Sequence, residues 1–100
     1  MRIVGITKNS TYFRTKFSPM LQRHARLETF ANGLQVLYHA GNNDRGEFCR
    51  LTTAVLIDGH YLQSITDYQN SRECLAALQT VTAATARDFI VTAKKQIERG

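Results

Sequence analysis

Three histidines and two cysteines are the side chains in this sequence best suited to catalysis or metal binding. His24, His39 and His60 belong to different segments, and no two of them have the HxH or HxxxH spacing that metal sites favour. Cys49 and Cys74 are far apart and form no CxxC motif. A nucleophilic cysteine would need Cys49 to meet His39 or His60, and nothing in the pattern supports that pairing. We therefore predict no metal, no cofactor and no enzyme activity, with both thiols buried.

The polar segment around GNNDRG, residues 41–46, is the other place where carboxylates gather. Asp44 and Glu47 have neither the spacing of a calcium-binding EF-hand loop nor the GK[ST] ending of a phosphate-binding loop. Two glycines flank the segment, which is typical of a solvated turn. We predict a loop here and no catalytic pair of acids.

Positive charge is concentrated at the start of the chain. The whole sequence carries a net charge of +5, and the first thirty residues alone carry six basic side chains against the single acidic Glu28. Such asymmetry favours an anionic partner, whether nucleic acid, an acidic protein surface or a membrane surface.

The stretch TYFRTKF, residues 11–17, places basic and aromatic side chains on one face of an extended strand. Cations mixed with an aromatic ring can bind single-stranded nucleic acid, by neutralising phosphates and stacking on bases. The alternative is that these cations only keep an exposed strand soluble. The predicted site for a partner or nucleic acid consists of Lys8, Tyr12, Arg14, Lys16, Arg23 and Arg26.

Length and composition indicate one small domain, residues 1–100, with 43% hydrophobic and 21% charged residues. No apolar run approaches the roughly 18 residues that a membrane-spanning helix needs. The N-terminus lacks the apolar segment of a signal peptide, because Gly5, Thr7 and Lys8 interrupt it. We expect a cytoplasmic protein that does not enter a membrane.

Turn signals divide the first two-thirds of the chain into successive hairpins. Residues 2–7 and 12–17 flank KNST, residues 26–31 and 34–40 flank Asn32-Gly33, and residues 49–57 and 60–67 flank Asp58-Gly59. A two-residue Asn-Gly turn would place Leu27 opposite Tyr38 and Arg26 opposite His39. The core face of that hairpin would then hold Leu27, Ala31, Leu34, Val36 and Tyr38.

The third hairpin has a simpler pattern. Its Asp58-Gly59 turn predicts Arg50 opposite Asp67, a cross-strand ion pair. The inward set would be Cys49, Leu51, Thr53, Val55 and Ile57, with Leu62 on the return strand. The apolar residues left on the second face, which could meet a partner or a second copy, would be Phe30, Leu37, Phe48, Leu56, Tyr61 and Ile65.

The final third has helical periodicity, with Asn70 as the N-cap and Glu73 at the third helical position. One straight helix over residues 71–99 would be about 43 Å long, whereas a 100-residue domain has a radius of gyration of about 13 Å. Such a helix would project beyond the domain, pack against a second copy, or bend or split near TVTAAT, residues 80–85, where threonines and valine weaken helix propensity. We favour the bend or split.

Together these patterns predict an α+β fold: an antiparallel sheet of five or six strands, with a long C-terminal helix, bent or continuous, packed on one face. The stretch EFCRLTTAVLIDGHYLQSITDYQNSRECLAALQTV resembles the C-terminal half of a double-stranded-RNA-binding domain in its order of strand, turn, strand and helix. That family begins its last helix with a lysine cluster, whereas this chain has Arg72 followed by Glu73. The resemblance implies the order of elements only, and no RNA-binding residue is carried over from it.

The function we expect is that of a non-enzymatic binding protein. A small accessory or inhibitory domain of the kind found in phages and mobile elements would fit, bound to a protein or nucleoprotein partner such as a host nucleic-acid-handling complex. The alternative is direct DNA or RNA binding through the basic N-terminal hairpin. A homodimer is a further candidate assembly.

Overall fold

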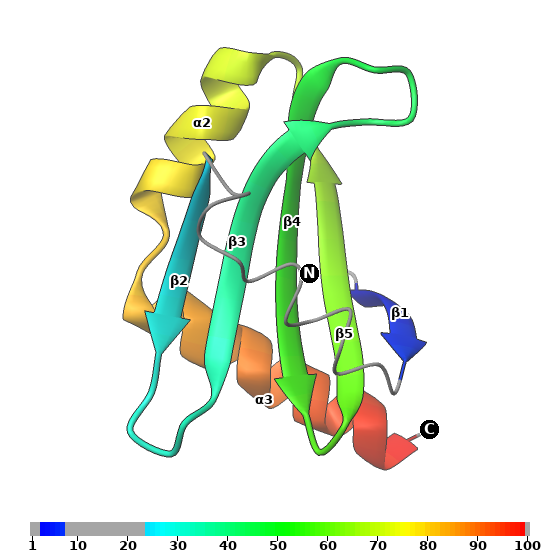
Figure 1. The fold of residues 1–100 in the computed structure, drawn as a ribbon, viewed down its shortest axis with the longest axis vertical. Helices are drawn as coiled ribbons and strands as arrows, with labels where there is room; N and C mark the ends of the chain where they lie inside the picture. Colours follow the sequence, from blue (N-terminus) through cyan, green and yellow to red (C-terminus); the bar gives the residue numbers. More distant parts are fainter. Residues whose placement is uncertain (1–2, 8–23, 100) are drawn as a thin grey trace.

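The computed structural model describes residues 3–7 and 24–99, which form an antiparallel sheet with helices packed on it (Figure 1). Among these residues the strands lie in the order β1-β5-β4-β3-β2. The predicted α+β class with an antiparallel sheet is confirmed. The predicted number of strands is not, because the strand expected at residues 12–17 lies outside the described residues. The elements are β1 (Ile3–Thr7), β2 (Ala25–Thr29), β3 (Gln35–Asn42), β4 (Phe48–Ile57), β5 (His60–Asp67), α2 (Ser71–Thr80) and α3 (Ala83–Arg99).

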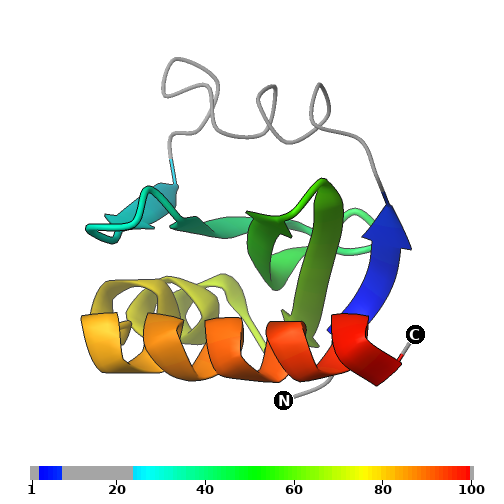
Figure 2. The same cartoon turned by 90° about the horizontal axis from the view of Figure 1, so that it is seen from below.

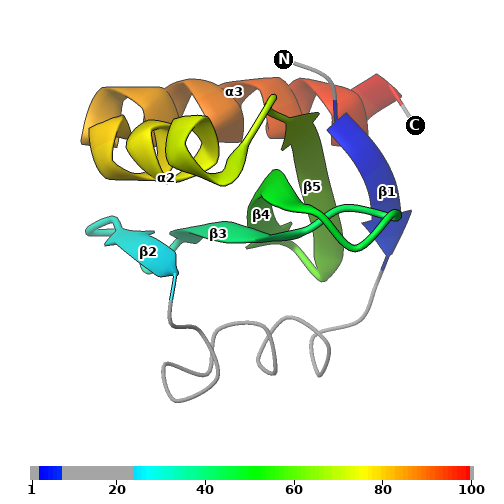
Figure 3. The same ribbon diagram turned by 90° about the horizontal axis from the view of Figure 1, so that it is seen from above.

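Both helices lie on the same face of the sheet, which Figures 2 and 3 show edge-on. Helix α2 packs against β3 and β4, and α3 packs against β4. We call the opposite side of the sheet the helix-free face, since no described helix covers it. Neither described helix is long and apolar enough to cross a membrane.

The β4–β5 hairpin has the predicted register. Asp58 and Gly59 both have positive φ, 50° and 79°, as a two-residue type I′ turn requires. Ile57 therefore pairs with His60, and Arg50 pairs with Asp67. The predicted inward residues of this hairpin face the helices, and Leu51, Val55, Ile57 and Leu62 belong to the main core.

The β2–β3 hairpin differs from the prediction by one residue. Leu27 pairs with Leu37, Arg26 with Tyr38, and Ala25 with His39. The loop is longer than the Asn-Gly pair, because the Gly33 amide donates to the Phe30 carbonyl and the Phe30 amide to the Leu34 carbonyl, both at 2.9 Å. Only Gly33, with φ 88°, is left-handed in this loop, which is the form of a three-residue hairpin connection with a bulge.

This one-residue slip changes which β2 side chains face the helices, because alternate strand residues point to opposite faces. Leu27 shares the helix-free face with Leu37 and is 45% exposed, so its predicted place in the core is wrong. Arg26 takes the helix side beside Tyr38, and the predicted Arg26–His39 pair does not form. Phe30 and Phe48 pack against the helix-side core instead of the second face.

The C-terminal helix is split, as the weak propensity of residues 80–85 predicts. Helix α2 begins at its N-cap Asn70, whose side-chain oxygen accepts from the Glu73 amide at 2.9 Å. It ends at Val81, whose φ of −64° and ψ of 144° are extended. Thr82 then caps α3, since its hydroxyl oxygen accepts from the Thr85 amide at 3.2 Å.

The main core lies between the sheet and the two helices. Phe89 and Ala93 of α3 and Cys74 of α2 are fully buried against Val36, Val55 and Leu62 of the central strands. Strand β1 adds a long-range pairing that no turn signal predicts, with Ile3 opposite Ser64 on β5. Its expected hairpin partner at residues 12–17 lies outside the described part of the chain.

Candidate functional site

Of the six residues predicted to bind a partner, only Arg26 falls within the described ranges 3–7 and 24–99. Lys8, Tyr12, Arg14, Lys16 and Arg23 lie outside them, so their grouping stays a prediction. Arg26 itself is held by the fold. Its Nη1 donates to three main-chain carbonyls at the end of α2: Val81 and Gln79 at 3.0 Å each, and Leu78 at 3.3 Å.

Arg26 supplies hydrogen-bond donors to the carbonyl groups at the C-terminal end of a helix. The last carbonyls of an α-helix have no partner within the helix, and they carry partial negative charge. A guanidinium satisfies several such oxygens at once because its donors form a planar fork. The Nη2 of Arg26 also lies 3.4 Å from the Glu28 carboxylate. The structure thus gives Arg26 a role in holding α2 to the sheet.

The outer edge of β2 is the part of the described sheet that offers backbone groups for further pairing. In an antiparallel pair of strands, every second residue forms main-chain hydrogen bonds to the neighbouring strand. The hydrogen bonds of the Phe30–Leu34 and His24–Ala40 pairs show that the even-numbered residues of β2 bond to β3. The amides and carbonyls of Ala25, Leu27 and Thr29 therefore point away from β3. No other described strand pairs with this edge. We refer to these three residues as the β2 edge.

Apolar side chains continue from the β2 edge across the helix-free face. Leu37, Ala54 and Tyr61 form a second buried cluster there, and Ala25 and Leu56 pack against it. Leu27 is one of two large hydrophobic side chains that are exposed among the described residues, the other being Val91 on α3. Leu27 is paired with Leu37 of this cluster across β2 and β3, whereas Val91 belongs to α3.

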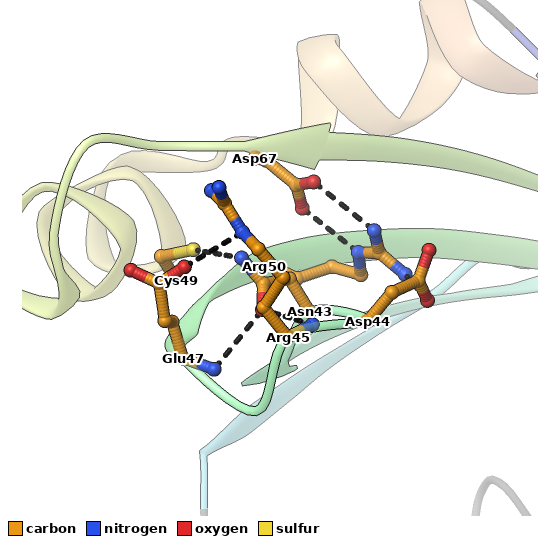
Figure 4. Close-up of polar contacts among 7 residues, drawn as sticks. All are labelled: Asn43, Asp44, Arg45, Glu47, Cys49, Arg50 and Asp67. Carbon is orange, nitrogen blue, oxygen red and sulfur yellow. Dashed lines mark hydrogen bonds and ion pairs between the residues drawn. The ribbon is translucent and has the colours of Figure 1, made fainter.

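The charged residues in the loop before β4, at the start of β4 and at the end of β5 pair with one another (Figure 4). Arg50 binds both carboxylate oxygens of Asp67, at 2.8 and 3.0 Å, and Asp44 at 3.2 Å. The hydrogen bond from Arg50 lowers the pKa of Asp67 below its usual value. The carboxylate of Glu47 meets Arg45 at 2.9 Å. The loop carboxylates thus neutralise neighbouring arginines, and Asn43 organises the turn by accepting from the Arg45 and Glu47 amides.

A cavity of about 330 Å³ opens between the sheet and the helices where α2 gives way to α3. Its lining includes Tyr38, Thr53 and Ser64, which are paired directly across β3, β4 and β5 on the helix side. We call these three residues the polar row and the cavity the junction pocket. The hydroxyl-bearing residues that line it are Tyr38, Thr53, Ser64, Thr66, Tyr68, Thr80 and Thr85.

Tyr38 brings a buried hydroxyl group to this pocket. It is 2% exposed, and its hydroxyl oxygen has no hydrogen-bond partner among the described residues. Burial, together with the nearby Glu28 carboxylate, raises the pKa of Tyr38 to about 12. The phenol therefore stays protonated at neutral pH and keeps a donor to offer.

The two cysteines are the other titratable residues singled out by the sequence. Cys49 and Cys74 are free and buried, and burial raises the pKa of the Cys74 thiol, which leaves less thiolate. Among the described residues, no three His, Cys, Asp or Glu side chains gather as a metal site would require. Sequence reasoning missed the junction pocket, although the alignment of a tyrosine, a threonine and a serine across three strands was a signal available once the registers were known.

Comparison with protein-family models, curated proteins and solved structures found no significant match to this chain.

Proposed function

We propose that this chain is a non-enzymatic binding protein, a small accessory or inhibitory domain that docks on a protein or nucleoprotein partner. The observation that supports this most is the β2 edge, where outward-pointing backbone groups stand beside the exposed Leu27. A partner segment in extended conformation could add to such an edge as a further strand.

The β2 edge offers both elements of strand addition. The amides and carbonyls of Ala25, Leu27 and Thr29 would supply main-chain hydrogen bonds, which give affinity. The Leu27 side chain, which is paired with Leu37 across the strands, would contact alternate side chains of the partner, which gives specificity. Burial of a large apolar side chain is worth about 1.5–3 kcal/mol, so Leu27 would be a principal contact.

The test compares substitutions of the two exposed large apolar residues, Leu27 at 45% and Val91 at 52% exposure. Tagged wild-type protein is used to capture and identify a partner from extract of its source cells, and binding is then measured with L27K and with V91K. We expect L27K to weaken binding at least ~10-fold and V91K to leave it unchanged, with both variants folded by circular dichroism. Equal binding by L27K and wild type would contradict docking at the β2 edge.

Direct nucleic-acid binding is the second candidate function, favoured by the concentration of charge in the first thirty residues. Lys8, Tyr12, Arg14, Lys16 and Arg23 would contact the phosphates and bases. Affinity for single-stranded DNA or RNA should then fall steeply with salt, because bound cations release counterions from the phosphates. Arg14→Glu combined with Lys16→Glu should abolish binding. If wild-type protein shifts neither single- nor double-stranded DNA or RNA at low salt, this candidate fails.

A further inference from the structure

The junction pocket exists because the two helices part over the polar row. Val81 is extended and ends α2, so no continuous helix covers the middle of the sheet at this point. Thr80 and Thr85, on either side of the break, are exposed and line the pocket. The floor is formed by Tyr38, Thr53 and Ser64 on adjacent strands.

The polar row stands next to a fully apolar row of the same strands. The next row on the same strands is Val36, Val55 and Leu62, each with 0% exposure. Ser64, at 7% exposure, is the one buried residue other than tyrosine and cysteine that carries a polar side chain in the described part of the chain. A buried hydroxyl without a partner destabilises the folded state, and phenylalanine would fill the Tyr38 position without that cost.

We propose that the junction pocket binds a small neutral molecule with an apolar body and a hydrogen-bond acceptor such as an amide carbonyl. Tyr38 would donate to the acceptor after a small side-chain adjustment, and Phe89 and Leu51 would contact the apolar body. This proposal does not rest on the proposed function, because the pocket lies on the helix side of the sheet and the β2 edge takes no part in it.

Charge and size determine the class of ligand. None of the described residues that line the pocket is charged, and the two charges that act on Tyr38, Arg26 and Glu28, lie 3.4 Å from each other as an ion pair. A charged ligand would therefore lose its hydration without an unpaired counter-charge to offset the loss. The protonated phenol of Tyr38 provides a neutral donor across the physiological range. The volume is at the lower end of the range for ligand pockets, which is about 300–1,000 Å³. A compound with a single ring and one polar group fits these limits.

The experiment uses benzamide as the probe, with benzoate and benzamidine as charged controls of the same shape. Each is titrated to about 10 mM, since a fragment of this size binds weakly, and amide chemical shifts are followed by NMR. We expect benzamide to shift the amides of Tyr38, Thr53, Ser64 and Phe89, and the two charged compounds to leave them unchanged. No shift with benzamide, or equal shifts with all three compounds, would overturn the proposal.

Two variants locate the binding on the protein. Y38F keeps the ring and removes the donor, so benzamide affinity should fall ~3- to 10-fold while the fold is retained. T85L places a larger side chain at the mouth and should block binding, whereas T92L, on the same helix but not in the pocket lining, should not. Unchanged affinity in both Y38F and T85L would place benzamide elsewhere and reject the pocket as its site.

Discussion

Arg26 shows how a surface cation in the sequence becomes part of the fold. Its guanidinium donates to the carbonyls of Leu78, Gln79 and Val81, which would otherwise be unpaired at the end of α2. In the sequence, Arg26 belongs to the basic residues predicted to bind a partner. In the structure, its hydrogen bonds join the edge strand β2 to the helix layer.

Replacing Arg26 with methionine keeps the aliphatic stem and removes these bonds. Hydrogen bonds to charged groups contribute about 1.5–3 kcal/mol. The Arg26 side chain is 38% exposed, so we expect R26M to lower the free energy of unfolding by about 1–2 kcal/mol. Urea denaturation measures this loss. R45M is the control, because the Arg45 side chain is 81% exposed and its ion pair should contribute less than about 0.5 kcal/mol. Equal effects of R26M and R45M would show that the carbonyl contacts do not stabilise α2.

The Arg50–Asp67 pair makes stability depend on pH. Because Arg50 lowers the pKa of Asp67 in the folded protein, its contribution is present above the ordinary aspartate pKa of 3.8 and is lost as pH falls through the folded value. We expect D67N to melt at a lower temperature than wild type at pH 7, and the difference to shrink as pH falls below the ordinary aspartate value and Asp67 becomes protonated in the folded protein. D88N is the control, since Asp88 forms no ion pair with any residue in the described ranges. If the difference in melting temperature between D67N and wild type stayed the same in acid, the lower stability of D67N would come from packing and not from the ion pair.

At the scale of elements, the break between α2 and α3 depends on a few neighbouring residues. Val81 leaves the helix, and Thr82 provides a new N-cap through its hydroxyl oxygen, which accepts from the Thr85 amide. The break lets two short helices follow the twisted sheet, where one straight helix would project beyond it. It also opens the junction pocket.

Removing the cap of α3 should destabilise the protein. We expect T82A to lower the free energy of unfolding by about 1 kcal/mol, as N-cap substitutions generally do. T92A makes the same chemical change within the same helix, where the Thr92 hydroxyl donates to the Asp88 carbonyl. It should be close to neutral, because alanine has the higher helix propensity. Thermal denaturation of both variants tests this, and an equal loss in both would argue against Thr82 as a cap.

The two described hairpins with turn signals show how far local sequence determines register. Asp58 and Gly59 both adopt positive φ, so the predicted pairing of Arg50 with Asp67 is correct. Asn32-Gly33 suits both a two-residue turn and a three-residue connection with a bulge, and these differ by one residue in register. The helix layer favours the second, because it places Arg26 under the end of α2 and leaves Leu27 outside.

At the scale of the whole molecule, the described residues build one core between sheet and helices. Cys49 and Cys74 are buried at this interface, at 6% and 0% exposure, although they come from β4 and α2. A thiol reagent can therefore reach them only when sheet and helices separate.

Thiol labelling thus reports the opening of the whole core. We expect both cysteines to react at the same rate and about a thousandfold or more slowly than in urea-unfolded protein. The protection should fall with urea in parallel with global unfolding. C49A and C74A variants allow the two rates to be measured separately. Much faster labelling of Cys74 than of Cys49 would show that α2 detaches on its own.

The sequence alone determined the α+β class, the N-cap of α2 and the β4–β5 register, and it indicated the segment where the C-terminal helix could break. Each depends on local physics: turn conformation, side-chain capping and helix propensity act over a few residues. The tertiary structure decided the β2–β3 register, the helix-capping role of Arg26, the pairing of β1 with β5 and the polar row of Tyr38, Thr53 and Ser64. These features join residues that are distant in sequence, and the packing of both layers selects among alternatives that local preferences leave nearly equal.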